Sequence, residues 1–165
     1  LMWQAIKTNF AGLFLTLIMS VVIGRFWQGG LDNAEIIVRT DVGLAGVVLA
    51  LASGAAAVLS LITGLSSALV GVMVAVALLP PAATLGMMLG SGQFYMATGA
   101  ALLLGVNIVC INLSAKLMFL FKGVKPRTWL EKTKARQSVA IYTTVWIVTL
   151  VLLIAVIILR HRVIA

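Results

Sequence analysis

The stretch from Ser66 to Gly90 reads SSALVGVMVAVALLPPAATLGMMLG, and it decides how the rest of the chain is interpreted. It is almost unbroken apolar sequence, and as a helix rising about 1.5 Å per residue it is long enough to cross the ~30 Å hydrocarbon core of a bilayer. Pro80 and Pro81 lie in its middle. Each lacks the N–H that a helix needs, and each ring clashes with a carbonyl four residues earlier, in Val76 and Ala77. The sequence therefore predicts a membrane helix that is broken at mid-depth.

The composition extends this interpretation to the whole chain. Of its 165 residues, 62% are hydrophobic and only 10% are charged, which is typical of a membrane protein rather than a soluble domain. The apolar segments predict an all-α transmembrane helical bundle that forms a single domain over residues 1–165. We expect about five spanning helices, at residues 8–27, 43–63, 66–90, 94–121 and 138–159. Because the chain begins with Leu in amphipathic sequence, we also expect it to be the C-terminal portion of a longer protein.

Residues that carry chemistry are scarce. The chain holds one cysteine, one histidine and four acidic residues, and these form no metal-ligand cluster and no nucleophile–base pair. We therefore expect no enzyme activity, no metal and no cofactor. The formal net charge is +8, but six basic residues gather in the single loop 122–137, beside one acid. This clustering indicates membrane topology rather than nucleic-acid binding, and no nucleic-acid partner is expected.

The proline break is the candidate ligand site. Lipid cannot satisfy the freed backbone groups, so protein or a water-filled cavity must surround them. Free carbonyls would take a cation, whereas a half-helix resuming at Ala82 would offer its N–H groups to an anion. A purely structural kink, with Thr84 or Asn107 capping the freed groups, is the alternative. The candidate ligand- or ion-binding residues are Val76, Ala77, Leu79, Pro80, Pro81, Ala82, Thr84 and Asn107.

Small residues repeat every four positions in the segment 43–63. One stripe holds Ala52, Ala56 and Ser60, and another holds Gly46, Ala50 and Gly54. Such stripes let helix backbones approach closely in lipid, either within one bundle or between subunits. The packing candidates are Ala52, Ala56, Gly54 and Gly71, and we expect a homodimer.

The helix at 94–121 carries polar residues on two sides. Asn107, Cys110 and Ser114 share one stripe by helical periodicity, and Lys116 lies roughly opposite. Amides in hydrocarbon usually face protein, whereas a lysine near a helix end snorkels to the interface.

Two polar loops connect these helices. Residues 28–42 hold three of the four acids, beside Arg39, and favour either a short amphipathic or re-entrant turn or a cation-attracting vestibule. In the basic loop, Thr128 and Glu131 fit a capping box for a short helix at the headgroups.

Three segments together resemble a known family. ALASGAAAVLS, LSSALVGVMVAVALLPPAATLG and NIVCINLSAKLMFLFKGVKPR are similar to the membrane domain of the "domain of unknown function 389" family, over about residues 35–127. The helix at 8–27 fits this family more loosely. The resemblance implies further membrane helices and usually a soluble domain before this chain. It also implies an earlier proline-broken helix, and hence an inverted repeat of the transporter kind. No activity is established for the family, so it implies no catalytic residues.

Two functions remain open. The first is a small-solute or ion transporter, or a channel-like protein, with its site at the proline break. The alternative is a membrane-anchored sensor or regulatory scaffold whose dimerising bundle positions a soluble ligand-binding domain. A solvent-accessible cavity at the prolines favours the transporter, and a fully packed break favours the scaffold. We expect the inner membrane of a prokaryote as the location.

The distribution of positive charge gives a topology that can be tested. Apart from Lys116, seven lysines and arginines fall on the side of loop 122–137 and four on the other side, so this loop is predicted to be cytoplasmic and residues 28–42 external. With Cys110 replaced, cysteines at positions 32–35 should react with an impermeant thiol reagent on intact cells, and cysteines in 122–137 should not. The reverse labelling pattern would overturn the topology.

Overall fold

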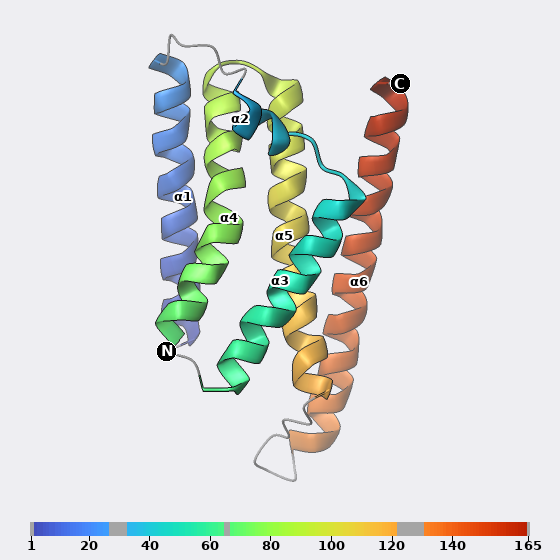
Figure 1. The fold of residues 1–165 in the computed structure, drawn as a ribbon. Helices are drawn as coiled ribbons and strands as arrows, with labels where there is room; N and C mark the ends of the chain where they lie inside the picture. Colours follow the sequence, from blue (N-terminus) through green and yellow to red (C-terminus); the bar gives the residue numbers. More distant parts are fainter. Residues whose placement is uncertain (1, 27–32, 65–66, 122–130, 165) are drawn as a thin grey trace. The chain divides into compact units, whose positions relative to one another are not determined.

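The computed structural model describes residues 2–26, 33–64, 67–121 and 131–164 as helices and their connections (Figure 1). Within these residues the chain is all-helical, as predicted. The helices are α1 (Met2–Phe26), α2 (Ala34–Val38), α3 (Leu44–Ile62), α4 (Ser67–Gly90), α5 (Phe94–Phe121) and α6 (Glu131–Ile164).

The predicted break at Pro80 and Pro81 is wrong. α4 is helical from Ser67 to Gly90 with both prolines inside it, and its ribbon is continuous (Figure 1). Adjacent prolines remove two consecutive N–H donors, so the loss is confined to about one turn. Membrane helices tolerate this where neighbouring groups and small backbone adjustments satisfy the freed carbonyls. Pro81 is one of the most completely buried side chains, which places its ring among protein atoms.

Three helices are long and apolar enough to cross a membrane. Among the described residues these spans are Val70–Gly90, Phe94–Met118 and Thr143–Arg160. The apolar parts of α1 and α3, Phe10–Phe26 and Leu44–Ser60, are shorter. At about 1.5 Å per residue each reaches about 25 Å, the lower limit for a span, so five crossings remain a prediction.

α6 begins earlier than the sequence suggested. It runs without interruption from Glu131 to Ile164, so the expected separate helix at the headgroups and the span at 138–159 belong to one helix of 34 residues. The expected cap, Thr128, lies outside the described residues.

The described chain forms two compact units. Unit 1 comprises Leu1–Val42 and Ala75–Leu104, and unit 2 comprises Gly43–Val74 and Gly105–Ala165. α4 and α5 each contribute one segment to both units.

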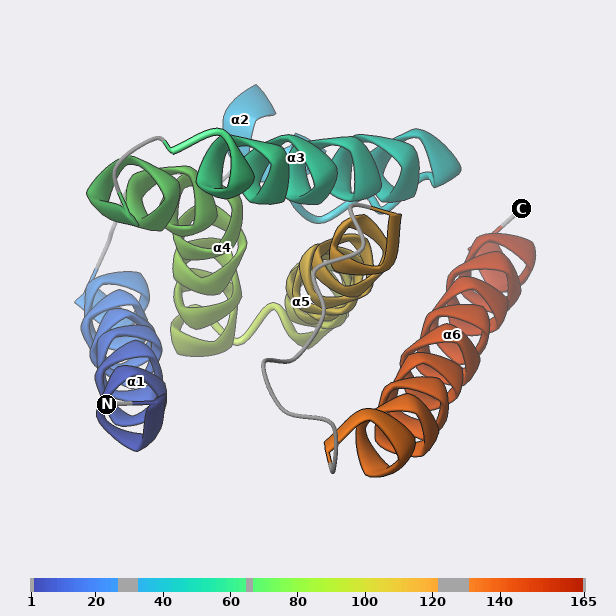
Figure 2. The ribbon, with the colours of Figure 1, turned by 90° about the horizontal axis from the view of Figure 1, so that it is seen from below.

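In unit 1, α1 and α4 lie side by side (Figures 1 and 2), and their backbones are in direct contact. A Cβ added at Gly86 would lie 2.5 Å from Ser20 Cβ and 2.9 Å from the Leu17 carbonyl oxygen. One turn on, a Cβ at Gly90 would overlap the Val21 carbonyl.

The contact is reciprocal, because a Cβ at Gly24 of α1 would overlap the Met87 carbonyl of α4. Ser20-x₃-Gly24 therefore faces Gly86-x₃-Gly90. The numbers of the facing residues rise together along the two helices, so α1 and α4 run parallel.

The rest of unit 1 closes around the end of α4. Gly92, with φ +77°, ends the helix in a Schellman turn, in which the Gln93 N–H donates to the Met88 carbonyl at 2.9 Å. The chain reverses there into α5. Met88 and Ala97 form a buried cluster, against which Ile36 of α2 packs. The loop predicted as an amphipathic or re-entrant turn thus contains a helix that covers the α4–α5 turn.

In unit 2, α3 packs on α5 through small side chains and one strong hydrogen bond. The Ser114 hydroxyl donates to the Leu51 carbonyl at 2.8 Å, and the Cys110 thiol points at the Val47 carbonyl at 3.9 Å. A Cβ at Gly54 would lie 2.9 Å from Ile111 Cα. Of the stripe predicted from helical periodicity, Cys110 and Ser114 are buried and Asn107 is half-buried.

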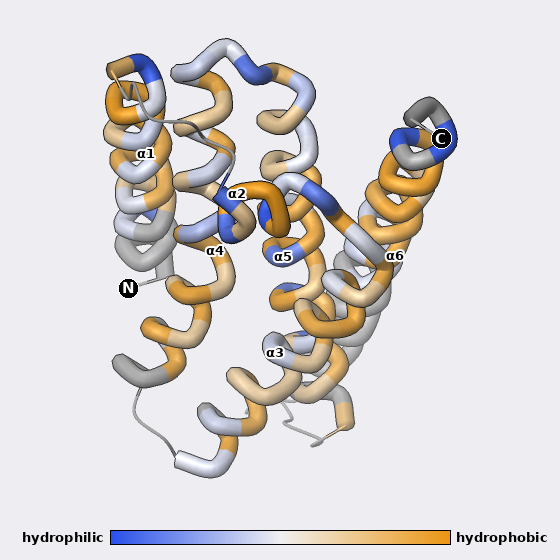
Figure 3. Tube along the Cα trace, turned by 45° about the horizontal axis from the view of Figure 1, so that its top comes forward, coloured by the Kyte–Doolittle hydropathy of each residue, from blue (hydrophilic) through white to orange (hydrophobic). Residues whose placement is uncertain are grey.

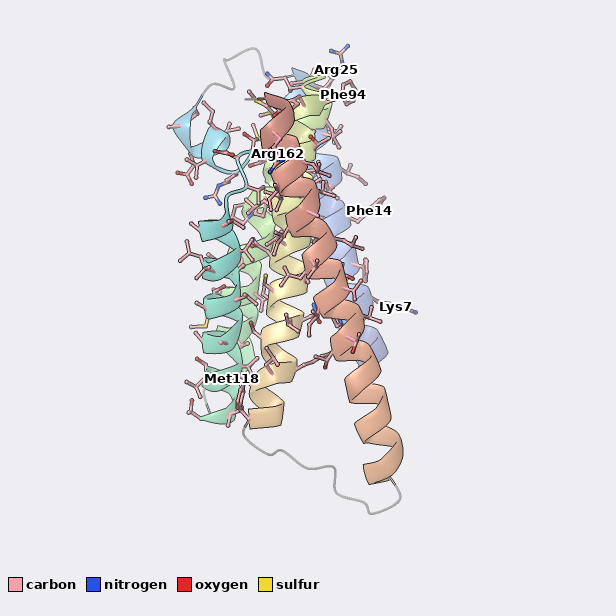
Figure 4. The ribbon with its side chains drawn as sticks, turned by 90° about the vertical axis from the view of Figure 1, so that its right-hand side faces the viewer. Lys7, Phe14, Arg25, Phe94, Met118 and Arg162 are labelled. Carbon is pink, nitrogen blue, oxygen red and sulfur yellow. The ribbon has the colours of Figure 1, made fainter. Side chains whose placement is uncertain are left out.

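Outward-facing side chains are largely apolar. On α1, Phe14 is 65% exposed and projects away from the helix, with Lys7 and Arg25 toward opposite ends (Figure 4). Only 6% of the span Thr143–Arg160 in α6 is buried. Figure 3 shows this span mostly in the orange of hydrophobic residues, and hydrophilic residues follow near the C-terminus. Such an apolar exterior fits a lipid surrounding.

At the α1–α4 crossing, replacing glycine by alanine is predicted to lower the stability of the protein instead of raising it. Replacing glycine by alanine inside a helix normally stabilises it by roughly 0.5–1 kcal/mol. Gly86→Ala and Gly90→Ala should instead destabilise the protein by about 1–3 kcal/mol, because the new methyl group overlaps α1. Thermal unfolding in detergent measures the change.

Gly12→Ala is the matched control. Gly12 lies in α1, the helix that Gly86 and Gly90 contact, and an added Cβ there has no heavy atom within 4 Å. This variant should keep or slightly raise the stability. If Gly86→Ala and Gly12→Ala behave alike, α1 and α4 do not make this contact.

Candidate functional site

The proline turn of α4 has one buried side and one exposed side. Pro81 and Ala82 are buried and Thr84 is only 4% exposed, whereas Val76 is 67% and Leu79 41% exposed. All the candidates on α4, Val76 to Thr84, belong to unit 1. The helix therefore directs Pro81, Ala82 and Thr84 toward other protein atoms, and leaves the side chains of Val76 and Leu79 exposed.

Continuity of α4 changes the chemistry that this turn can offer. Ala82 lies in the interior of a helix rather than at the start of one. Interior N–H groups bond to carbonyls of the preceding turn, so the anion site expected at the start of a half-helix has lost its basis. An oxygen ligand remains, because Pro80 cannot donate to the Val76 carbonyl. Carbonyl and hydroxyl oxygens are ligands for cations.

Asn107 was predicted to join this site from α5. It lies in the half-buried part of α5 that belongs to unit 2, whereas Thr84 and the prolines belong to unit 1. That Asn107 joins the proline turn stays a prediction.

The four packing candidates have different environments. Gly54 is buried against α5, as described above. Ala52 and Ala56 are exposed, although they lie on the same helix. Gly71 is exposed as well, and an added Cβ there meets nothing within 4 Å. Two of the candidates on α3 thus make a small-residue face that the described part of the chain does not cover.

Sequence reasoning missed two features. The first is the pair Ser20 and Gly24 on α1. Two small residues four positions apart are the sequence signal that could have predicted this helix contact. The second is a pair in unit 2, in which the Lys116 ammonium lies 5.7 Å from the centre of the Trp146 ring. Lys116 was expected only to snorkel, and no signal in the sequence indicated its aromatic partner.

In the polar segment 28–42, the charges of Glu35 and Arg39 have structural roles. Asn33 caps α2, its side chain accepting from the Glu35 N–H at 3.0 Å, and Glu35 pairs with Arg39 one turn later. Over the described residues, no group of three His, Cys, Asp or Glu side chains is placed to hold a metal ion.

These features define the class of protein. Apolar spans, an apolar exterior and helix contacts made through glycine and serine are those of a polytopic helical membrane protein.

The chain belongs to the family described as Domain of unknown function (DUF389), whose sequence model matches residues 1–113. The match includes α1, which was expected to fit only loosely, and it ends before the expected limit near residue 127.

An uncharacterised protein of the archaeon Methanocaldococcus jannaschii is 37% identical over 158 residues. The alignment covers 96% of this chain and 49% of the relative, so the chain spans about half the length of that relative. No solved structure matches.

Proposed function

We propose that this chain is part of a transporter or channel-like protein for a small solute or ion, with its site at the proline turn of α4. The observation that carries the proposal is the pair of prolines inside a membrane span. A proline in a helix interior costs about 3 kcal/mol or more, and a passive anchor has no need of it. The span in α6 contains none.

A cation is the ligand that this turn favours. Pro80 lacks the N–H that would donate to the Val76 carbonyl, and the Thr84 hydroxyl lies one turn beyond Pro80 on the same helix. No acidic residue occurs in the three spans, so coordination would depend on neutral oxygens, as in channels that replace a hydration shell with carbonyls.

The test compares two proline variants of the full-length protein. Pro80→Ala with Pro81→Ala restores two N–H donors, so the variant should fold with equal or greater stability but lose its response to the ion. Stabilisation by chloride salts of Na⁺, K⁺ and Mg²⁺ is measured by thermal unfolding, and ion flux is measured in proteoliposomes. Asn107→Leu should weaken the same response.

Pro126→Ala is the control, because Pro126 is the one proline of the chain outside α4. It should leave stabilisation and flux at wild-type level. A folded double variant with wild-type stabilisation and flux would remove the prolines from the function.

The exposed small-residue face of α3 favours a second function. Ala52 and Ala56 suit close approach to another helix, and a second copy of the chain is the partner we propose. Such a dimer also suits a membrane-anchored sensor or scaffold that positions a soluble ligand-binding domain. In both functions we propose that the chain itself catalyses no reaction.

Two leucine substitutions on α3 separate dimerisation from folding. Ala56→Leu adds bulk on the exposed face, so it should convert a dimer to a monomer without loss of helical structure. Gly54→Leu adds bulk against Ile111, so it should unfold unit 2. Mass in detergent by light scattering and helicity by circular dichroism give the two readouts. An unchanged mass for Ala56→Leu would show that this face contacts lipid.

The location and repeat complete the proposal. The archaeal relative supports a prokaryotic cytoplasmic membrane, with the basic loop on its inner side. The parallel direction of α1 and α4 suits helices two crossings apart in an alternating bundle, and an inverted repeat with helices preceding this chain remains our proposal.

A further inference from the structure

Lys116 is a charged residue inside an apolar span. It lies near the end of the span Phe94–Met118, and it is half-buried. A charge at this depth is costly unless it reaches the interface or finds a partner, and intramembrane ionisable residues commonly have a function. Lys116 is therefore a candidate ligand-binding residue of unit 2.

Trp146 of α6 gives Lys116 a defined position. The ammonium lies 5.7 Å from the centre of the indole ring, within the distance of a cation–π interaction. The two helices are also in contact elsewhere, since a Cβ at Gly105 would lie 3.8 Å from the Leu153 methyl groups. Lys116 thus lies at a junction between two packed helices rather than on an isolated helix.

The depth of the pair matches a lipid headgroup. Lys116 lies two residues before the end of its span, and Trp146 lies three residues after the start of the span in α6. Both residues are thus near the end of the α5–α6 pair where residues 122–130 join the two helices. Tryptophan is enriched at this level of the bilayer, and lysine extends its ammonium toward it.

The charge of the chain favours an anion here. Lys116 is followed within twenty residues by six more basic residues and one acid, and no acidic residue occurs in the three spans. α6 itself carries Lys132, Lys134 and Arg136 in the turns that precede the start of its span at Thr143. Basic positions between membrane helices on the cytoplasmic side attract anionic lipid headgroups.

We propose that Lys116 and Trp146 form a binding site for the phosphate group of an anionic phospholipid at the junction of α5 and α6. The ammonium has three N–H donors, so it can face the indole ring and still donate to a phosphate oxygen. The acyl chains would lie along the exposed apolar side chains of α6, among them Val145 and Val148. The site is independent of the proline turn and of the proposed transport function.

Lipid-dependent stabilisation tests the proposal. The full-length protein in detergent is titrated with dioleoylphosphatidylglycerol or dioleoylphosphatidylcholine, and its unfolding temperature is measured. The wild-type protein should be stabilised more by the anionic lipid. Lys116→Gln should lose at least half of this difference, Lys116→Arg should keep it, and Trp146→Phe should reduce it. Lys7→Gln, which loses the same charge on α1, should respond like the wild-type protein.

Two results would overturn the site. One is an equal response of Lys116→Gln and wild-type protein to the anionic lipid. The other is equal stabilisation by inorganic phosphate at the same concentration, because the ligand would then be a free anion rather than a lipid. If Lys116→Gln does not fold, phosphatidylglycerol retained by Lys116→Arg and Trp146→Phe is compared by native mass spectrometry. Equal retention by these two variants also contradicts the proposal.

Discussion

Contact between backbones, without side chains between them, is the interaction on which unit 1 depends. Lipid is as apolar as leucine, so burying an apolar side chain between two membrane helices gains little. Dispersion and weak Cα–H···O contacts must hold them together, and both grow steeply as the axes approach. Gly86 and Gly90 of α4 and Gly24 of α1 permit that approach from both sides. The buried cluster of Met88 and Ala97 then depends on where this crossing fixes α4.

In unit 2, close packing of two helices is supplemented by a hydrogen bond between them. The Ser114 hydroxyl reaches the Leu51 carbonyl of the neighbouring helix, whereas the hydroxyls of Ser60 and Thr149 bond to carbonyls of their own helix. An internal bond satisfies the hydroxyl but fixes no neighbour. The Ser114 bond therefore adds to the close contact of Gly54 with Ile111 in setting the register between α3 and α5.

The sequence predicted the helices better than it predicted their interruptions. The bounds of α3 and α5 follow from runs of apolar residues, and periodicity assigned Cys110 and Ser114 to one side of α5. The prediction of a break at Pro80 and Pro81 was wrong because it considered only the hydrogen-bond donors that the prolines lack. Neighbouring groups can keep a membrane helix intact despite that loss. The partner of Lys116 could not be predicted, because pairing residues 116 and 146 requires the relative register of two helices.

The length of α6 has a mechanical consequence. Its 34 residues reach about 51 Å, against a hydrocarbon core of ~30 Å, so about 20 Å of rigid helix stands clear of that core. Most of it lies before Thr143, on the side of the basic loop. When the helix tilts, its outer part thus swings about a point near Trp146. A tilt of about 10° within the bilayer would carry the outer end sideways by about 3 Å. Small changes of lipid thickness would then become displacements of charge outside the membrane.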